Sequence, residues 1–133
     1  MSLNEENRRL IVDIEIMKSR EAFADLEMLV EGNRWNGAAN RLYYAVFHAA
    51  NALLIHEGQT IKSHKGSMIM FNKLYILTEK LLATFGILYS QLETLREESD
   101  YTLLYNVDPD KLKNYINPAK EMIDTIAEMV KNN

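Results

Sequence analysis

Four polar residues stand at helical spacing in a segment that is otherwise almost wholly apolar. They are Arg41, Tyr44, His48 and Asn51, separated by steps of three, four and three residues. Such steps place side chains on one stripe of an α-helix. The stripe could be an internal strip of hydrogen-bonded side chains, since buried polar groups are normally satisfied. Alternatively, it could be the wall of a cleft or a self-association surface.

A further polar residue, Arg96, falls within a predicted apolar helix face, between Leu92 and Leu103. An inward-facing arginine must be paired, because an isolated buried charge is very costly. Asp100 lies one helical turn further on and can reach it. The pair could be purely structural. Alternatively, Arg96 could bind an anion, because its planar guanidinium matches the geometry of phosphate.

A third polar group is the run Ser63-His64-Lys65-Gly66. Ser63 can cap a helix that begins at His64. Basic residues at a helix start oppose the helix dipole, and a bound anion would relieve this. Gly66 would let a ligand or another helix approach closely. The alternative is an ordinary solvated helix start.

The sequence predicts neither a metal site nor a cofactor. It has no cysteine, which excludes disulfides, thiolate metal sites and thiol catalysis. The histidines His48, His56 and His64 are eight residues apart, whereas a helical zinc site pairs histidines four residues apart. No glycine-rich phosphate loop of the P-loop or Rossmann kind is present.

Helical periodicity accounts for nearly the whole chain, and glycines, prolines and capping residues divide it. Helices are predicted over about residues 4–31, 35–57, 63–75, 78–103 and 109–130. The apolar stripe of the last one keeps its phase across Pro118, so we expect a single helix kinked there. Short connections make neighbouring helices antiparallel. The predicted fold is therefore all-α: an antiparallel up-and-down four-helix bundle with an additional short helix, in one domain of residues 1–133.

Two of these helices carry apolar stripes that we expect to face the core. In the first helix the stripe is Leu10, Ile14, Met17, Ala24 and Met28. In the fourth helix it is Leu81, Leu82, Phe85, Leu88, Tyr89, Leu92 and Leu95.

The composition is that of an ordinary globular protein, with 47% hydrophobic and 26% charged residues. Its net charge of −4 argues against a strongly basic nucleic-acid binder but allows a small local basic site. No segment approaches the roughly 18 apolar residues of a membrane span, and the N-terminus lacks the apolar core of a signal peptide. We therefore expect a cytoplasmic protein that does not enter a membrane.

Three segments resemble the HEPN superfamily, in particular its small stand-alone bacterial and archaeal members. They are RWNGAANRLYYAVFHAANALLIHEG (residues 34–58), SHKG (residues 63–66) and LREESDY (residues 95–101), in the order that the family shows. The resemblance covers roughly residues 34–130 and implies a bundle of four or five helices that often dimerises. It also implies a link to nucleotides or RNA. Some HEPN proteins are metal-independent endoribonucleases, some are partners of minimal nucleotidyltransferases in toxin–antitoxin pairs, and some are non-catalytic binding modules.

The ribonuclease motif of this superfamily is an arginine followed four to six residues later by a histidine, and two copies face each other in a dimer. By this resemblance Arg96 takes the place of the motif arginine, and Tyr101 stands where the histidine would be. A neutral imidazole exchanges protons near pH 7, whereas a phenol with a pKa of about 10 does so poorly. Tyr101 can still donate a hydrogen bond or stack on a base.

We therefore predict a HEPN-like non-catalytic binding module that acts as a homodimer. It would bind a nucleotide, RNA or a nucleotidyltransferase partner, as part of a toxin–antitoxin-like pair. One alternative is a metal-independent endoribonuclease toxin that uses Arg96 with His48 or His64, if the fold brings an imidazole near Arg96. Another is a structural or assembly protein without a ligand. The residues predicted to form the site are Arg41, Tyr44, His48, His64, Lys65, Arg96, Asp100 and Tyr101.

Overall fold

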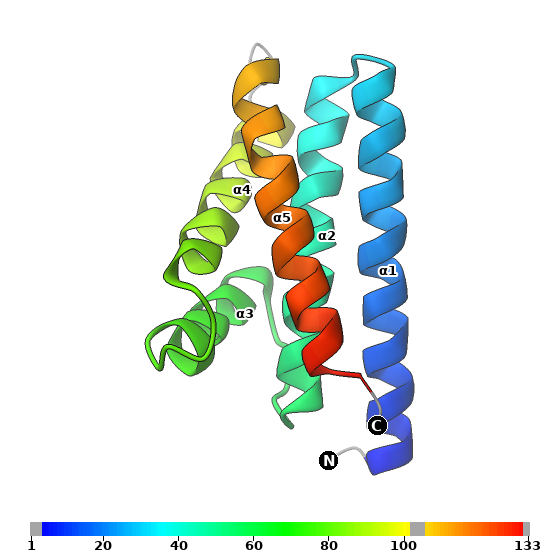
Figure 1. Cartoon of the computed structure of the whole chain (residues 1–133), viewed down its shortest axis with the longest axis vertical. Helices are drawn as coiled ribbons and strands as arrows, with labels where there is room; N and C mark the ends of the chain where they lie inside the picture. The colour runs from blue at the N-terminus through cyan, green and yellow to red at the C-terminus, as the bar shows by residue number, and fades with distance from the viewer. Residues whose placement is uncertain (1–3, 102–105, 132–133) are drawn as a thin grey trace.

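The structure, a computed structural model, describes residues 4–101 and 106–131, with the backbone alone at Tyr101. Every element in these residues is helical. The α-helices are α1 (Glu5–Glu31), α2 (Trp35–His56), α3 (His64–Phe71), α4 (Ala83–Tyr101) and α5 (Pro109–Met129), and a π-helical turn, η1 (Asn72–Ile76), follows α3 directly. Helices α1, α2, α4 and α5 alternate in direction, and α3 crosses one end of the bundle (Figure 1). The predicted all-α bundle with an additional short helix is confirmed.

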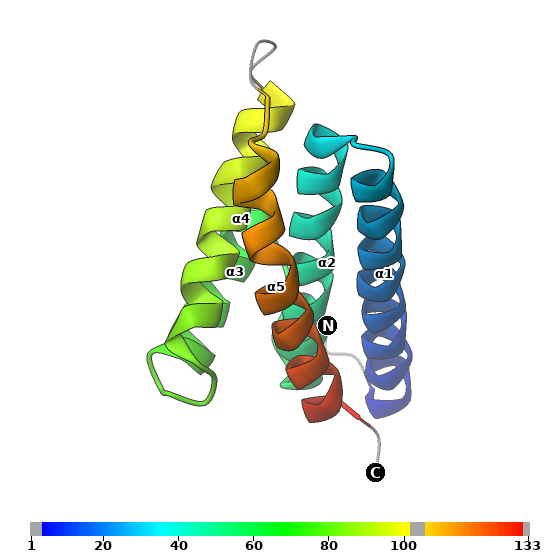
Figure 2. The same ribbon diagram turned by 45° about the horizontal axis from the view of Figure 1, so that its top comes forward.

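Helix α2 is the centre of the bundle and packs against α1, α3, α4 and α5. It is buried nearly all round because small and branched apolar side chains occupy most of its surface. Its fully buried alanines, among them Ala45, Ala49 and Ala52, allow neighbouring helices to approach closely. Figure 2 shows α1 on one side of α2, with α4 and α5 on the other. Polar side chains on α2 are therefore held by whichever helix covers them.

Local sequence signals mark the starts of α1, α3 and α5 and the end of α2 close to where they were predicted. The side chains of Asn4, Ser63 and Asp108 cap α1, α3 and α5 by accepting hydrogen bonds from backbone N–H groups of the first turn. Gly58, with φ of +90°, follows the end of α2 in a conformation that glycine adopts without strain. Helix α5 is continuous through Pro118, as the unbroken apolar stripe predicted.

The start of the fourth helix was predicted wrongly. Residues 78–82 form turns, and α4 begins only at Ala83. Leu82, expected in the core, is 57% exposed. The π-helical turn η1 and Glu79, with φ of +62°, redirect the chain before α4 begins. The predicted helix end at Leu103 lies outside the described residues.

The apolar stripe predicted for the first helix also faces the wrong way. The residues of α1 that pack into the core are Val12, Ser19, Ala22, Phe23 and Leu26. Leu10, Met17, Ala24 and Met28 are exposed and Ile14 is half-buried. Helix α1 therefore has apolar residues on two opposite faces, and sequence alone did not distinguish the face that packs on α2. Among the described residues, no helix combines the length and apolar character that crossing a membrane requires.

Candidate functional site

Tyr43 of α2 joins residues from three helices in one polar cluster. Its hydroxyl lies 3.0 Å from Nδ1 of His64, the first residue of α3. The guanidinium carbon of Arg96, on α4, lies 4.8 Å from the centre of the Tyr43 ring, a cation–π contact. Arg96 and His64 thus share a buried aromatic neighbour, although they are 32 residues apart in sequence. We call Tyr43, His64, Glu93 and Arg96 the Arg96 cluster.

Arg96 is only 8% exposed, which confirms that it points inward from α4. Its Nη1 lies 3.8 Å from Oδ2 of Asp100, the partner that helical spacing predicted. The Asp100 carboxylate also accepts a hydrogen bond from Nδ2 of Asn40, at 3.2 Å. The hydrogen bond between Asn40 and Asp100 connects α4 to the first half of α2. The Asp100 side chain is 33% exposed and is therefore in contact with solvent.

His64 is held by its helix position and by stacking. The Ser63 hydroxyl accepts a hydrogen bond from the Gly66 N–H at 2.9 Å, which fixes the first turn of α3. The His64 ring stacks on Phe47 with 4.2 Å between centroids. Burial lowers the pKa of His64, and the positive charge of Arg96 and the neighbouring His48 lower it further. His64 is therefore a neutral imidazole at pH 7 and can accept a proton.

Gly66 makes room for the side chain that caps α3. A Cβ atom built on Gly66 would lie 2.8 Å from the Ser63 hydroxyl oxygen. Any larger residue would displace the hydroxyl that caps α3. One close approach at Gly66 is therefore internal to the helix start, and the approach of a ligand there stays a prediction.

The predicted stripe on α2 divides into two parts. Arg41, Tyr44 and His48 are half-buried beside the Arg96 cluster: the Arg41 guanidinium carbon lies 5.0 Å from the centre of the Tyr44 ring, and Tyr44 contacts the rings of both His48 and His64. Nδ1 of His48 lies 2.7 Å from a carboxylate oxygen of Glu15 on α1. Asn51, in contrast, is buried and accepts a hydrogen bond from the Ser67 hydroxyl. Asn51 therefore belongs to the hydrogen-bonded interior, and the other three belong to the site region.

Glu93 is a site residue that the sequence reading missed. Burial raises the pKa of its carboxyl, Glu97 raises it further, and Arg96 and Lys65 oppose this shift. Among the described residues, its Oε2 atom is buried without a hydrogen-bond partner. Glu93 precedes Arg96 by three residues, and that spacing could have placed it beside the arginine.

Tyr43 is another cluster residue that was not among the predicted site residues. Its ring is fully buried in the core, and its hydroxyl reaches His64. Burial raises the pKa of this hydroxyl above its ordinary value, and the nearby Glu93 raises it further, against the opposing effect of Arg96. Tyr43 therefore stays protonated, and its hydroxyl donates to Nδ1 of His64 or accepts from it according to the tautomer of the imidazole. Helical periodicity places a tyrosine ring but does not locate its hydroxyl partner.

The remaining predicted residues lie at the edge of the cluster. Lys65 is exposed, and its charge acts on Glu93. The side chain of Tyr101 lies outside the described part of the structure, so the predicted role of this residue stays a prediction. Within residues 4–101 and 106–131, no three His, Cys, Asp or Glu side chains gather in a way that could hold a metal ion.

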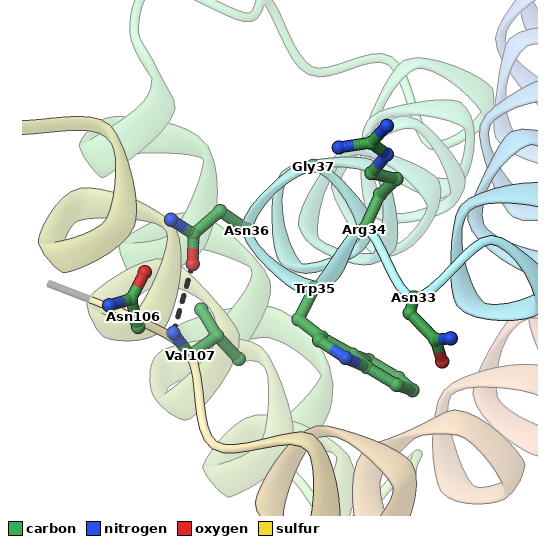
Figure 3. Close-up of a pocket in the computed structure, with 7 residues that line it drawn as sticks. All are labelled: Asn33, Arg34, Trp35, Asn36, Gly37, Asn106 and Val107. Carbon is green, nitrogen blue, oxygen red and sulfur yellow. Dashed lines mark hydrogen bonds between the residues drawn. The ribbon is translucent and has the colours of Figure 1, made fainter.

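A separate pocket of about 420 Å³ lies at the N-terminal end of α2 (Figure 3). Its walls are Asn33, Arg34, Trp35, Asn36, Gly37, Asn106 and Val107. The Asn36 side-chain carbonyl accepts a hydrogen bond from the Val107 N–H at 2.9 Å, which ties the start of α2 to the segment before α5. This pocket contains none of the residues that the sequence predicted for the site.

Comparison with known proteins agrees with the described architecture. A family model described as "HEPN domain" matches residues 14–130. A UPF0332 protein of Thermotoga maritima is 28% identical over 128 residues, which is 96% of each chain. A Methanocaldococcus jannaschii protein named "Putative toxin" is 27% identical over 113 residues, 85% of this chain and 84% of the relative. A UPF0332 protein of Archaeoglobus fulgidus is 26% identical and covers 92% of this chain and 97% of its own.

Proposed function

Because the chain belongs to the HEPN domain family, we propose that it is a binding module for RNA or a nucleotide, in which the Arg96 cluster holds a phosphate group. The observation that carries the proposal is the convergence of Arg96 and His64 on Tyr43 from two different helices. A guanidinium presents five N–H donors, enough to serve Asp100 and a phosphate oxygen together. Tyr44, half-buried beside Arg41, offers an aromatic face on which a base could stack.

The relatives support a biological setting for this binding. Two of them, both from Methanocaldococcus jannaschii, carry the name "Putative toxin". We propose that the protein acts in a toxin–antitoxin-like pair as a homodimer, with a nucleotidyltransferase as its protein partner. The binding residues in this proposal are Arg41, Tyr44, His48, His64, Lys65, Arg96, Asp100 and Tyr101.

A metal-independent endoribonuclease is the second candidate, and one observation favours it. Arg96 and His64 contact the same Tyr43 side chain, and His64 lies close enough to Arg96 and to His48 for their charges to lower its pKa. In the tautomer in which Nδ1 donates to the Tyr43 hydroxyl, Nε2 of neutral His64 could take the proton from a ribose 2′-hydroxyl. The 2′-oxygen would attack the adjacent phosphorus as the 5′-oxygen leaves and is protonated, while Arg96 stabilises charge on the phosphate. His64 would then supply the proton transfer that Tyr101 supplies poorly.

The experiment is fluorescence polarisation of a labelled single-stranded RNA of mixed sequence, in a buffer with EDTA. We expect wild-type protein to bind and Arg96→Met to bind at least tenfold more weakly while keeping its helical circular dichroism. Arg96→Lys, which keeps the charge but loses the planar fork, should bind with intermediate affinity. Arg20→Met is the matched control, because Arg20 pairs with Asp124 on the exposed surface. Equal binding by wild type and Arg96→Met would exclude the proposed role of Arg96.

The same samples, resolved on a denaturing gel, separate the two candidates. RNA that stays intact with wild-type protein supports binding alone. Cleavage that disappears in His64→Gln while RNA binding persists would establish the ribonuclease instead.

A further inference from the structure

The pocket at the N-terminal end of α2 has one aromatic wall and several amide walls (Figure 3). Trp35 supplies the ring, and the polar side chains that line the pocket are Asn33, Arg34, Asn36 and Asn106. None of the described residues in its walls is acidic. The pocket has a volume of about 420 Å³, within the usual range of ligand sites. It therefore suits a flat ligand that presents hydrogen-bonding groups along its edge.

Hydrogen bonds hold the walls of this pocket in place. The N–H of Arg34 donates to the Leu29 carbonyl at 2.8 Å and closes the turn between α1 and α2. Within that turn Asn33 has φ of +58°, a left-handed conformation that asparagine adopts more readily than most residues. On the other side of the pocket, the hydrogen bond from the Val107 N–H to Asn36 fixes the segment before α5 (Figure 3). A ligand therefore meets walls that are already ordered, which lowers the entropic cost of binding.

The chemistry of these walls matches a purine base. Bases stack on aromatic rings such as that of Trp35. An asparagine amide pairs with N6 and N7 of adenine, and an arginine pairs with O6 and N7 of guanine. Both purines present N7 as an acceptor, and pyrimidines have no equivalent atom. We propose that the pocket binds a purine base of the RNA strand whose phosphate is held by the Arg96 cluster.

Lys113 of α5 lies over the Trp35 ring, with Nζ 5.2 Å from the ring centre. Lys113 is exposed and has a long flexible side chain, so a base can take its place on the ring. A cation–π contact at an exposed site is weaker than the stacking of a base on an aromatic ring. The exchange therefore favours the bound base.

The pocket and the Arg96 cluster follow one another along the same face of α2. Asn36 in the pocket wall comes one turn before Asn40, whose Nδ2 donates to Asp100 at 3.2 Å. Tyr43 of the cluster comes seven residues after Asn36, close to two full turns and roughly 10 Å of helix. A short single strand can therefore reach both sites, with a base in the pocket and a phosphate at Arg96. The identity of the strand rests on the proposed function, whereas the affinity of the pocket for a purine does not.

Fluorescence of Trp35 tests the pocket directly, because it is the only tryptophan in the chain. Adenosine and uridine are the probes, since a nucleoside has no phosphate and does not need Arg96. We expect adenosine to quench the fluorescence saturably and uridine to bind about fivefold more weakly or worse. The same quenching curve for the two nucleosides, or no quenching by adenosine, would overturn the proposal.

A double variant removes two of the amides and leaves the tryptophan in place. Asn33→Gly keeps the left-handed backbone, because glycine adopts it without strain, and Asn106→Ala shortens an exposed side chain. We expect this variant to bind adenosine about fivefold more weakly with unchanged helical circular dichroism. Asn7→Ala is the matched control and should bind like wild type, because Asn7 is exposed in the first turn of α1, at the other end of the bundle (Figure 1). Adenosine binding as tight in the double variant as in wild type would refute the assignment of the pocket.

Polarisation with oligo(A) and oligo(U) of equal length separates this inference from the proposed function. Wild type should prefer oligo(A), and the double variant should lose that preference while it keeps an affinity that depends on Arg96. Arg96→Met should bind both strands more weakly by the same factor. If Arg96→Met matches wild type, the proposed function fails, and adenosine quenching still decides whether the pocket takes a purine. If Arg96 matters but wild type binds the two strands alike, the purine pocket is excluded.

Discussion

At the scale of single residues, the two carboxylates nearest Arg96 occupy different environments. Asp100 is partly exposed and pairs with Arg96 and Asn40. Glu93 has a buried carboxylate oxygen, and burial raises its pKa despite the nearby cations Arg96 and Lys65. The folded protein therefore favours the protonated form of Glu93, and its ionisation lowers the free energy of unfolding.

Glu93→Gln should stabilise the protein at neutral pH. Because the folded-state pKa is raised, the stability that the acid contributes is present below its ordinary pKa, near 4.5, and is lost as pH rises through the folded value. Glutamine keeps the shape without ionising. We expect the melting temperature to rise by roughly 2–4 °C at pH 7.5 and to match wild type near pH 4. Thermal scans monitored by circular dichroism measure this.

The control for this prediction is Glu121→Gln, which removes an exposed carboxyl on α5. Its melting temperature should follow that of wild type at both pH values. A Glu93→Gln variant that is less stable than wild type at pH 7.5 would show that the carboxylate is stabilised by Arg96 more than it is destabilised by burial.

Much of the candidate site could be predicted at the residue scale, because charge on an apolar helix face is conspicuous. Arg96 broke the periodicity of its helix, and its inward direction and its pairing with Asp100 are confirmed. The Tyr43 hydroxyl could not be predicted, since its partner His64 comes from a helix whose placement depends on tertiary packing. Asn51 followed the same helical spacing as His48 but meets Ser67 inside the core. Residue spacing assigns a side chain to one face of a helix. The residues that this face contacts depend on which neighbouring helix packs against it.

At the scale of elements, the close approach of α4 to η1 depends on Gly86. A Cβ atom there would lie 2.7 Å from the side-chain oxygen of Asn72 and 3.0 Å from Ile76. Both neighbours belong to the π-helical turn. A glycine inside a helix costs about 1 kcal/mol relative to alanine, so the contact that it permits has to compensate.

Gly86→Ala should therefore destabilise the protein although alanine is the better helix former. We expect a loss of about 1–2 kcal/mol from forced movement of η1 against α4, net of the gain in helix propensity. Gly37→Ala on α2 is the matched control, because its Cβ would meet only Leu29 at 3.5 Å, an ordinary contact. That variant should be unchanged or more stable by up to about 1 kcal/mol. Urea unfolding of both variants gives the comparison, and a shift of the same sign in both would contradict the steric explanation.

The two wrong predictions at this scale share a physical cause. Periodicity identified apolar faces on the first and fourth helices. However, α1 has two such faces, and the turn at residues 77–82 ends in two leucines, of which Leu81 is buried and Leu82 exposed. An apolar pattern indicates that a helix face is buried, but it does not identify the element against which that face packs. The π-helical turn could not be foreseen, because one extra residue per turn leaves no distinct pattern in a single sequence.

At the scale of the whole molecule, the bundle was predictable because several independent signals agreed. Capping residues, glycines after helices and an uninterrupted stripe through Pro118 all favoured the same helices, and short connections favoured antiparallel neighbours. The net charge constrains function at the same scale. The counts of 15 Lys and Arg against 19 Asp and Glu argue against RNA binding by a broad basic surface.

RNA binding should therefore depend only weakly on salt. Affinity for a single strand falls with salt by a logarithmic slope of about −0.7 for each phosphate that is neutralised. If Arg96 and Lys65 are the cations that meet phosphate, the slope should lie near −1.4, and Lys65→Met should reduce it to about −0.7. Polarisation titrations from low to moderate salt measure it, with Lys120→Met as control, because Lys120 pairs with Asp124 on the surface of α5. A wild-type slope steeper than about −3 would mean that RNA lies on many cations elsewhere, and the Arg96 cluster would then not be the principal contact.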